Sequence, residues 1–167
     1  MCLARDAIAY HLEAGRLLIP TESWYDQFET LRRQAGVFVT LRKSAELRGC
    51  MGTLEPVYAD TALEIIENAI SAAFRDPRFG PVSADELAGL SVSIDIVKEM
   101  VRVPGMLDLN PLCYGVVVRQ GIRRGMLLPG IEEITSIEQQ VAIAREKAGI
   151  GEHETVELYR FEVDRYH

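Results

Sequence analysis

The chain has 167 residues, a length that suits one compact domain, or one domain with a small subdomain packed on it. Apolar residues make up 48% and charged residues 26%, so apolar surface is sufficient to offset chain entropy, and an intrinsically disordered protein is excluded. No apolar run approaches the roughly 18 residues that cross a bilayer, and no repeat period is present. We therefore expect a globular protein with no membrane span.

The net charge of −7 argues against a general nucleic-acid binder, which needs a positive field to displace counterions from phosphates. The three cysteines, Cys2, Cys50 and Cys113, are odd in number and widely spaced, and no CxxC or histidine spacing indicates a metal site. Asp6 and Glu13 interrupt any leader-like apolar run at the start of the chain. These features predict a protein of the reducing cytoplasm, with no disulfide framework and no metal.

Hydrophobic periodicity predicts an alternation of helices and strands. Apolar residues recur three or four positions apart where a helix is expected, and they alternate with other residues where a strand is expected. The expected order is a helix over 3–17, a helix or irregular connection over 23–35, strands over 36–43 and 46–54 joined at Ser44–Ala45, a helix from Asp60 or Thr61 to 74, a short helix over 83–90, a strand over 90–97, a loop over 104–112, a hairpin over 114–129 that turns near Gln120–Gly121, a helix from 135 that stops at Gly149, and a strand over 155–163.

Several serine and threonine residues precede a glutamate by three positions, the spacing of a capping box that begins a helix. The pairs are Thr61–Glu64, Ser83–Glu86 and Thr135–Glu138. Together with the hairpin-connected strands, this pattern predicts an α+β fold with a mainly antiparallel sheet, and no linker divides the chain.

The segment LRGCMGT, residues 47–53, is unusual because two glycines interrupt a strand, which is typical of a bulge or of a close approach to the backbone. If the strand is regular, Arg48, Cys50 and Gly52 face one side, with neighbouring Cα atoms of that side roughly 6.5–7 Å apart. A guanidinium at that distance favours a thiolate, so a small-anion or nucleophile site is one interpretation. The other is a glycine bulge beside an ordinary buried cysteine.

The segment DPRF, residues 76–79, ends the helix before it. Asp76 can close the turn and Pro77 breaks the helix. Arg78 either forms a structural pair with Asp76 or binds a carboxylate elsewhere. Asp95 in the following strand is a candidate buried partner for Arg48 or Arg78.

LRGCMGTLEP resembles the signature of the AMMECR domain family. The resemblance extends to GVFVTLRK, AISAAFRDPRFGPVSADEL, the VSI strand, YGVVVRQGIRRGMLLP and the KAG that follows the last helix, so it covers about residues 3–161. The chain is similar to the short prokaryotic members, protein A of the AmmeMemoRadiSam system. The resemblance implies one AMMECR-type domain over residues 1–167, which can comprise two closely packed subdomains, with the cysteine motif in a cleft between a main antiparallel sheet and a smaller subdomain.

The resemblance implies no established reaction, but it implies association with a radical SAM protein and with a Memo-type protein that resembles extradiol dioxygenases. It also implies a binding surface for an unknown small molecule in the cleft. The positions that carry over from the family pattern are Arg48, Gly49, Cys50, Gly52, Thr53, Asp76, Pro77, Arg78 and Phe79.

Two positions depart from the family pattern. Tyr114 stands where family members usually carry a histidine, and Gly130 stands where they commonly carry a glutamine. A cysteine nucleophile normally needs a nearby base, and a tyrosine hydroxyl is a poor base at neutral pH. Tyr114 is nevertheless expected to line the ligand site.

Three functions follow as alternatives. The preferred one is a non-enzymatic accessory protein that binds a ligand or partner around Arg48 and Cys50. The second is an enzyme with Cys50 as nucleophile, Arg48 as thiolate stabiliser and glycine amides as oxyanion donors. The weakest is a nucleic-acid module built on Arg119, Arg123 and Arg124. No phosphate-binding, dinucleotide-binding or iron–sulfur motif is present, so no cofactor is expected.

Overall fold

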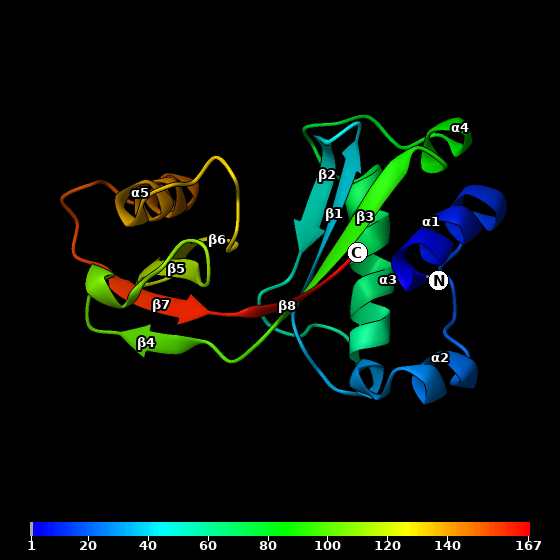
Figure 1. The fold of residues 1–167 in the computed structure, drawn as a ribbon, viewed down its shortest axis with the longest axis horizontal. Coiled ribbons are helices and arrows are strands. Elements are labelled where there is room, and N and C mark those ends of the chain that lie inside the picture. Colours follow the sequence, from blue (N-terminus) through cyan, green and yellow to red (C-terminus); the bar gives the residue numbers. More distant parts are fainter. Residues whose placement is uncertain (1) are drawn as a thin grey trace. The chain divides into compact units, whose positions relative to one another are not determined.

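The computed structural model describes residues 2–167, and the chain divides into two compact units. The first comprises the residues up to Val97 together with Asp164–His167, and the second comprises Lys98–Val163. Each unit has its own four-stranded sheet (Figure 1). Each also has its own cluster of buried hydrophobic side chains, so each is described by itself. Helices flank sheets whose strands pair antiparallel, which confirms the α+β class that the sequence predicts.

In the first unit, helices pack on one sheet. The strand order of this sheet is β2-β1-β3-β8, so β2 is an edge strand. Its elements are α1 (Leu3–Ala14), α2 (Glu22–Gln27), the 3₁₀-helix η1 (Glu29–Arg32), β1 (Val37–Lys43), β2 (Glu46–Gly52), α3 (Thr61–Phe74), α4 (Ala84–Leu87), β3 (Leu90–Val97) and β8 (Val163–Tyr166).

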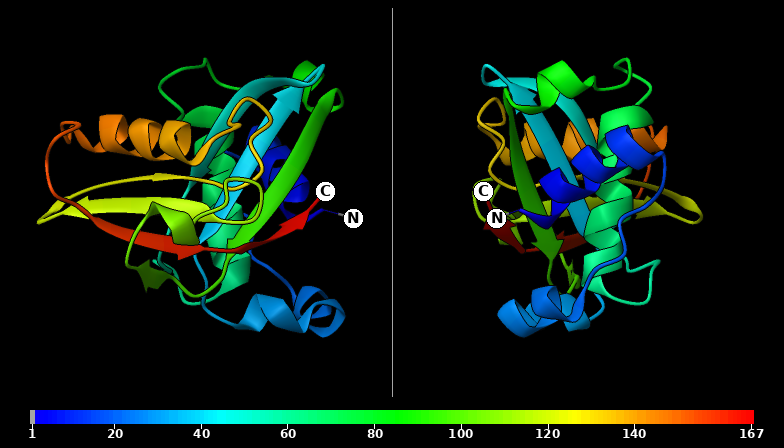
Figure 2. Two further views of the ribbon diagram at one scale, coloured as in Figure 1. Left: turned by 60° about the vertical axis from the view of Figure 1, so that its left-hand side comes forward. Right: turned by 90° about the vertical axis from the view of Figure 1, so that its right-hand side faces the viewer.

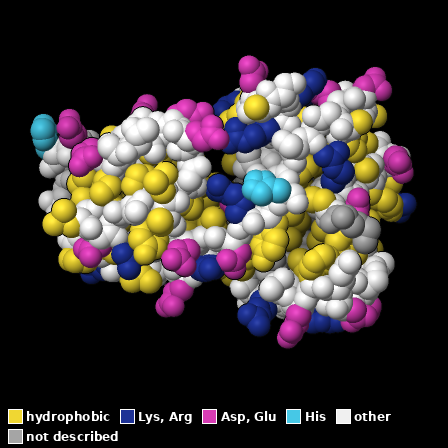
Figure 3. Space-filling model, in the orientation of Figure 1, with side chains coloured by type: hydrophobic (Ala, Val, Ile, Leu, Met, Phe, Trp, Pro, Cys, Tyr) yellow, Lys and Arg dark blue, Asp and Glu magenta, His cyan; other side chains and the backbone are white. Residues whose placement is uncertain are grey.

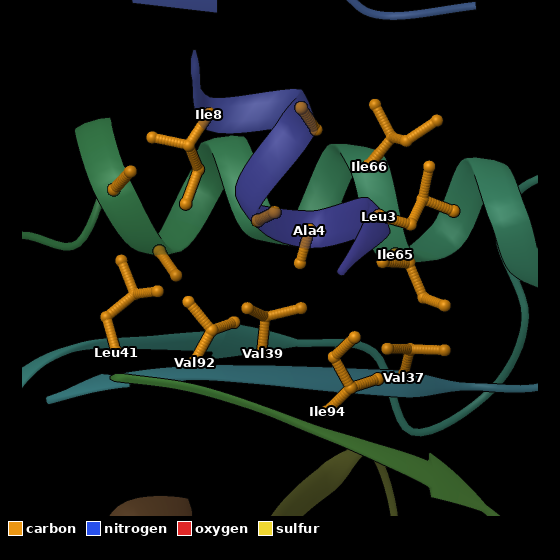
Figure 4. Close-up of a cluster of buried hydrophobic side chains, with 14 of the residues drawn as sticks. Leu3, Ala4, Ile8, Val37, Val39, Leu41, Ile65, Ile66, Val92 and Ile94 are labelled. Carbon is orange, nitrogen blue, oxygen red and sulfur yellow. The ribbon is translucent and has the colours of Figure 1, made fainter. Parts of the chain in front are cut away.

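One face of this sheet forms the core. Val37, Val39 and Leu41 occupy alternate positions of β1, so their side chains all point to the same side, where α1 and α3 lie (Figure 4). Each is fully buried, and burial of an aliphatic side chain of this size stabilises a fold by about 1.5–3 kcal/mol. The intervening positions, Phe38 and Thr40, therefore belong to the face opposite the helices.

The second unit has a sheet of order β4-β7-β5-β6, on which a single long helix packs. The close contact depends on Gly125, because a Cβ there would lie 2.0 Å from the carbonyl oxygen of Ala144. The elements are β4 (Val101–Val103), the 3₁₀-helix η2 (Met106–Asp108), β5 (Gly115–Gln120), β6 (Arg123–Leu127), α5 (Ile137–Ala148) and β7 (Glu157–Phe161).

Several helix ends differ from the expectation. α1 stops at Ala14 rather than at residue 17, because Gly15 adopts the left-handed conformation (φ 65°) that ends helices. Of the two predicted caps of α3, the structure has Asp60, whose carboxylate accepts from the Leu63 amide at 2.9 Å; the alternative cap Thr61, with its Thr61–Glu64 box, is wrong. The Asp60 side chain is one residue further from the helix and reaches the first free amides.

The other two capping predictions had different outcomes. The Ser83–Glu86 capping box begins α4 as predicted, and the Glu86 carboxylate accepts from the Ser83 amide at 3.2 Å. α5 is instead capped by Ser136, whose hydroxyl accepts from Gln139 at 3.1 Å, so Thr135 is not the cap. Adjacent hydroxyl residues are equivalent caps by sequence, and the backbone decides between them.

The closing strand also differs. The sequence predicts one strand over 155–163, but the alternating pattern is shared by β7 and β8, which belong to different sheets. The short strand β4 lies outside the predicted elements.

Candidate functional site

The cysteine motif lies on β2, whose register contains a bulge. Leu41 of β1 is opposite Gly49, and Arg42 is opposite Leu47, so Arg48 is an extra residue with no partner on β1. The glycine-rich strand therefore does bulge, as its sequence suggests. The regular alternation that would put Arg48 and Cys50 on one face is interrupted at Arg48.

Arg48 binds a carboxylate of α4, the short helix that follows α3. Its Nε and Nη2 atoms donate to the two carboxylate oxygens of Glu86 at 3.2 and 3.0 Å, and Nη2 also donates to the Pro81 carbonyl at 3.3 Å. Lys43 donates to the same carboxylate at 3.0 Å. Arg48, then Lys43 and the Ser83 amide, lower the pKa of Glu86 to about 2. The charge of Arg48 is thus compensated by Glu86.

The backbone of Cys50 is held by the DPRF turn. The Asp76 carboxylate accepts from the Cys50 amide at 2.9 Å, and Arg78 Nη2 donates to the Cys50 carbonyl at 3.3 Å. Asp76 and Arg78 also pair with each other through two hydrogen bonds of 2.9 and 2.7 Å. At the edge of β2, this pair therefore hydrogen-bonds the amide and the carbonyl of Cys50, as a neighbouring strand would. The structural Asp–Arg turn is the interpretation that the structure supports.

The Arg78 guanidinium and the amides of Cys50 and Arg78 hold the pKa of the buried Asp76 carboxyl well below its usual range, against the opposing effect of burial. Asp76 in turn raises the pKa of Arg78. Both groups therefore stay charged at neutral pH, and the Arg78 side chain remains 54% exposed beside the motif.

The Cys50 thiol points away from the helices. Gly49 faces α3, so the neighbouring Cys50 side chain belongs to the opposite face, where it is half-buried. Its sulfur accepts a hydrogen bond from the Thr40 hydroxyl, at 3.3 Å across the strand pair. The thiol is therefore neither sealed in hydrocarbon nor paired with a base.

The glycines of the motif make room for the protein itself. A Cβ on Gly49 would lie 2.2 Å from the carbonyl oxygen of Ala72 in α3, and a Cβ on Gly52 would lie 2.3 Å from the Phe38 ring. The close approach that the sequence predicts is thus made by α3 and by Phe38.

Thr53 anchors the end of the motif to a buried carboxylate. Its hydroxyl donates to Glu64 of α3, which also accepts from the amides of Val57 and Tyr58, each at 2.9 Å. Asn68 donates to the same carboxylate at 3.4 Å. Sequence analysis missed this network because Glu64 was interpreted as a capping residue. The sequence does contain a signal for a buried carboxylate, because Glu64 lies near the start of a largely apolar helix.

The contacts of two further predicted residues, Tyr114 and Asp95, are as follows. Tyr114 belongs to the second unit, where its ring lies 4.4 Å from the Arg160 guanidinium and its carbonyl accepts from Gln140 at 2.8 Å. Asp95 is paired with Arg165 through hydrogen bonds of 2.6 and 3.0 Å, so the expectation that it partners Arg48 or Arg78 is wrong. Arg165 is on β8, adjacent to β3 in the sheet.

The arginines proposed for nucleic-acid binding have intramolecular partners. Arg123 pairs with Glu154 at 2.6 Å, and Arg119 donates to the Gly121 carbonyl at 3.2 Å. On the face drawn in Figure 3, acidic and basic side chains are interspersed.

Within residues 2–167, no three His, Cys, Asp or Glu side chains come together in a way that could hold a metal ion. In the same part of the chain, no helix has both the length and the apolar character that crossing a bilayer requires.

Comparison with known proteins identifies the family and supports the fold. The family model described as AMMECR1 matches residues 1–166. The chain belongs to the AMMECR1 family. A Thermotoga maritima protein is 47% identical over 161 residues, which are 95% of this chain and 91% of that relative. Protein CA_C1420 of Clostridium acetobutylicum is 39% identical over 98% of this chain, which spans only 35% of that relative's length.

A solved structure supports the AMMECR1 fold independently. The crystal structure of an uncharacterized protein, PH0010, from Pyrococcus horikoshii is similar with a TM-score of 0.88 and 30% sequence identity. The match covers 98% of this chain and 86% of that chain.

Proposed function

We propose that this AMMECR1-family chain is an accessory protein that acts with a radical SAM protein and a Memo-type protein, and binds a ligand or partner around the LRGCMG motif. The observation that carries the proposal is the clamp on Cys50. Asp76 and Arg78 fix the backbone of this residue, while the Arg78 guanidinium stays exposed and the thiol stays half-buried. A fixed strand edge that presents a cation beside a thiol suits recognition of a polar partner.

The same geometry argues for binding rather than for nucleophilic catalysis. A cysteine nucleophile is normally activated by an adjacent base or by a cation that stabilises the thiolate. The Cys50 sulfur accepts a hydrogen bond from the Thr40 hydroxyl, and Arg48 is paired with Glu86. His11 of the first unit contacts Phe74 and the Arg16 carbonyl instead.

The test is affinity capture of the tagged chain from native lysate, with mass spectrometry of the recovered proteins. The wild type and the Cys113→Ser control, which alters an exposed cysteine of the second unit, should recover a radical SAM protein and a Memo-type protein. Arg78→Lys and Cys50→Ser should recover each at least about tenfold less, because loss of a charge-assisted hydrogen bond weakens binding by that order. Failure to recover either protein, or equal recovery by all variants, would contradict the proposal.

The alternative function is a cysteine-dependent enzyme with Cys50 as nucleophile. The observation in its favour is that Arg78 brings a guanidinium to 3.3 Å from the Cys50 carbonyl. The discriminating measurement is the alkylation rate of each cysteine against pH. In an accessory protein, Cys50 should be alkylated no faster at neutral pH than the exposed Cys113, whereas a nucleophilic Cys50 should be alkylated much faster.

A further inference from the structure

A hollow of about 370 Å³ lies in the first unit, and none of its lining residues belongs to the cysteine motif. Its walls come from the start of α1, from β1, from the first half of β3 and from the end of the chain. Figure 2 shows the start of α1 and the end of β8 side by side in both views. The volume corresponds to roughly a dozen water molecules at liquid density, so it can hold a small organic molecule.

The lining carries positive charge without acidic compensation. Arg5 and Arg42 both line the hollow, and none of its lining residues is an aspartate or glutamate. Arg5 donates to the carbonyls of Leu87, at 2.7 Å, and Leu90, and Arg42 donates to the Ala45 carbonyl at 3.3 Å. Neither forms an ion pair within residues 2–167.

Other residues with polar groups also contribute to the lining. The hollow is also lined by Ser91 and Ser93 of β3, by His167, and by Cys2, which precedes α1 and makes no capping hydrogen bond. The amides of the first turn of a helix have no partner within the helix. Hydroxyls, guanidiniums and such amides are the donors that bind oxyanions in proteins.

We infer that this hollow binds a small molecule through a phosphate or carboxylate group. The group lies between the Arg5 and Arg42 guanidiniums, which retain unused N–H donors after their bonds to carbonyls. The hydroxyls of Ser91 and Ser93 complete the donor set. The inference does not depend on the function of Cys50, because it uses none of the residues of that motif.

The test is titration of the full chain with inorganic phosphate and, separately, with succinate, followed by calorimetry and by NMR of the backbone amides. The site predicts saturable binding of at least one probe, with the amide shifts centred on Ser91 and Ser93. Saturable binding of phosphate but not of succinate would indicate a phosphorylated ligand. Saturable binding of succinate but not of phosphate would indicate a carboxylate ligand. Absence of saturable binding of both probes up to about 10 mM, which corresponds to less than about 3 kcal/mol, would overturn the inference.

Matched variants separate a site from general charge. Arg42→Gln removes an exposed lining cation and should weaken binding about tenfold, the usual scale for a charge-assisted hydrogen bond. Arg33→Gln removes the same charge from an exposed residue that does not line the hollow, and it should leave the affinity unchanged. Equal weakening by both variants would identify nonspecific attraction and overturn the inference.

Discussion

At the scale of single residues, the motif is held by an ion pair and a hydrogen bond between positions distant in sequence. Arg48 and Glu86 are separated by 38 positions, and Cys50 and Asp76 by 26. Sequence analysis identified Arg48, Cys50, Asp76 and Arg78 as important. Strand periodicity is local information, and it predicts that Arg48 lies beside the Cys50 thiol. The carboxylate that Arg48 binds depends instead on where the chain after α3 folds back, which local sequence does not show.

Asp76→Asn is expected to lower the free energy of unfolding at pH 7 by about 1–2 kcal/mol. The carboxylate is buried, but its partner Arg78 is half-exposed, so solvent screening reduces the value below that of a fully buried pair. Because the pKa of Asp76 is depressed in the folded state, its stabilisation is complete above the pKa of the unfolded chain, near 4, and is lost as the pH falls further. Urea denaturation at pH 7 and pH 3 should show the difference between wild type and variant narrowing at pH 3.

The control for Asp76→Asn is Asp26→Asn, which alters a mostly exposed carboxylate paired with Arg32. Its effect at pH 7 should be within about 0.5 kcal/mol of zero. If Asp76→Asn changed the free energy of unfolding as little as this control, the contacts of Asp76 with Arg78 and with the Cys50 backbone would add nothing to stability.

Ala45→Gly is expected to stabilise the chain by about 0.5–1 kcal/mol. Ser44 and Ala45 join β1 to β2 with φ values of 49° and 69°, the left-handed region that glycine adopts without the steric cost of a Cβ. Thermal and urea denaturation of the variant measure the change. Destabilisation would mean that the larger entropy of glycine in the unfolded chain outweighs the relief of strain.

At the scale of elements, the fold is determined by close contacts between strand and helix backbones. Gly49→Ala should lower the free energy of unfolding by more than about 2 kcal/mol, because its Cβ would meet the backbone of α3, which cannot move aside as a side chain can. Urea denaturation measures it. Gly80→Ala, where a Cβ meets nothing within 4 Å, is the matched control and should be nearly neutral. If Gly49→Ala and Gly80→Ala changed the free energy of unfolding by similar amounts, α3 would be able to shift and make room for the added Cβ.

The elements themselves were largely predictable. β3 begins at Leu90 and ends at Val97 as expected, and the turn at Ser44–Ala45 is correctly placed, because alternation and turn residues are local signals. The division of residues 155–163 between β7 and β8 was not predictable in the same way. Both strands alternate, and only the partner strand tells which sheet each joins.

At the scale of the whole molecule, the two hydrophobic cores are separate clusters of side chains. Gly125→Ala, which would place a Cβ 2.0 Å from a carbonyl of α5, should therefore reduce amide protection in β5, β6 and α5 more than in β1 and β3. Native-state hydrogen exchange measures this pattern, and Gly49→Ala should give the opposite one. Uniform loss of protection through the chain would show that the two cores unfold as one.

The order of the chain has a consequence for its synthesis. The sheet of the first unit receives its fourth strand, β8, only after the whole second unit has been translated. Until then the buried carboxylate of Asp95 lacks the guanidinium of Arg165. Until β8 has been translated and has left the ribosome, the first unit therefore lacks its fourth strand and holds an unmatched charge.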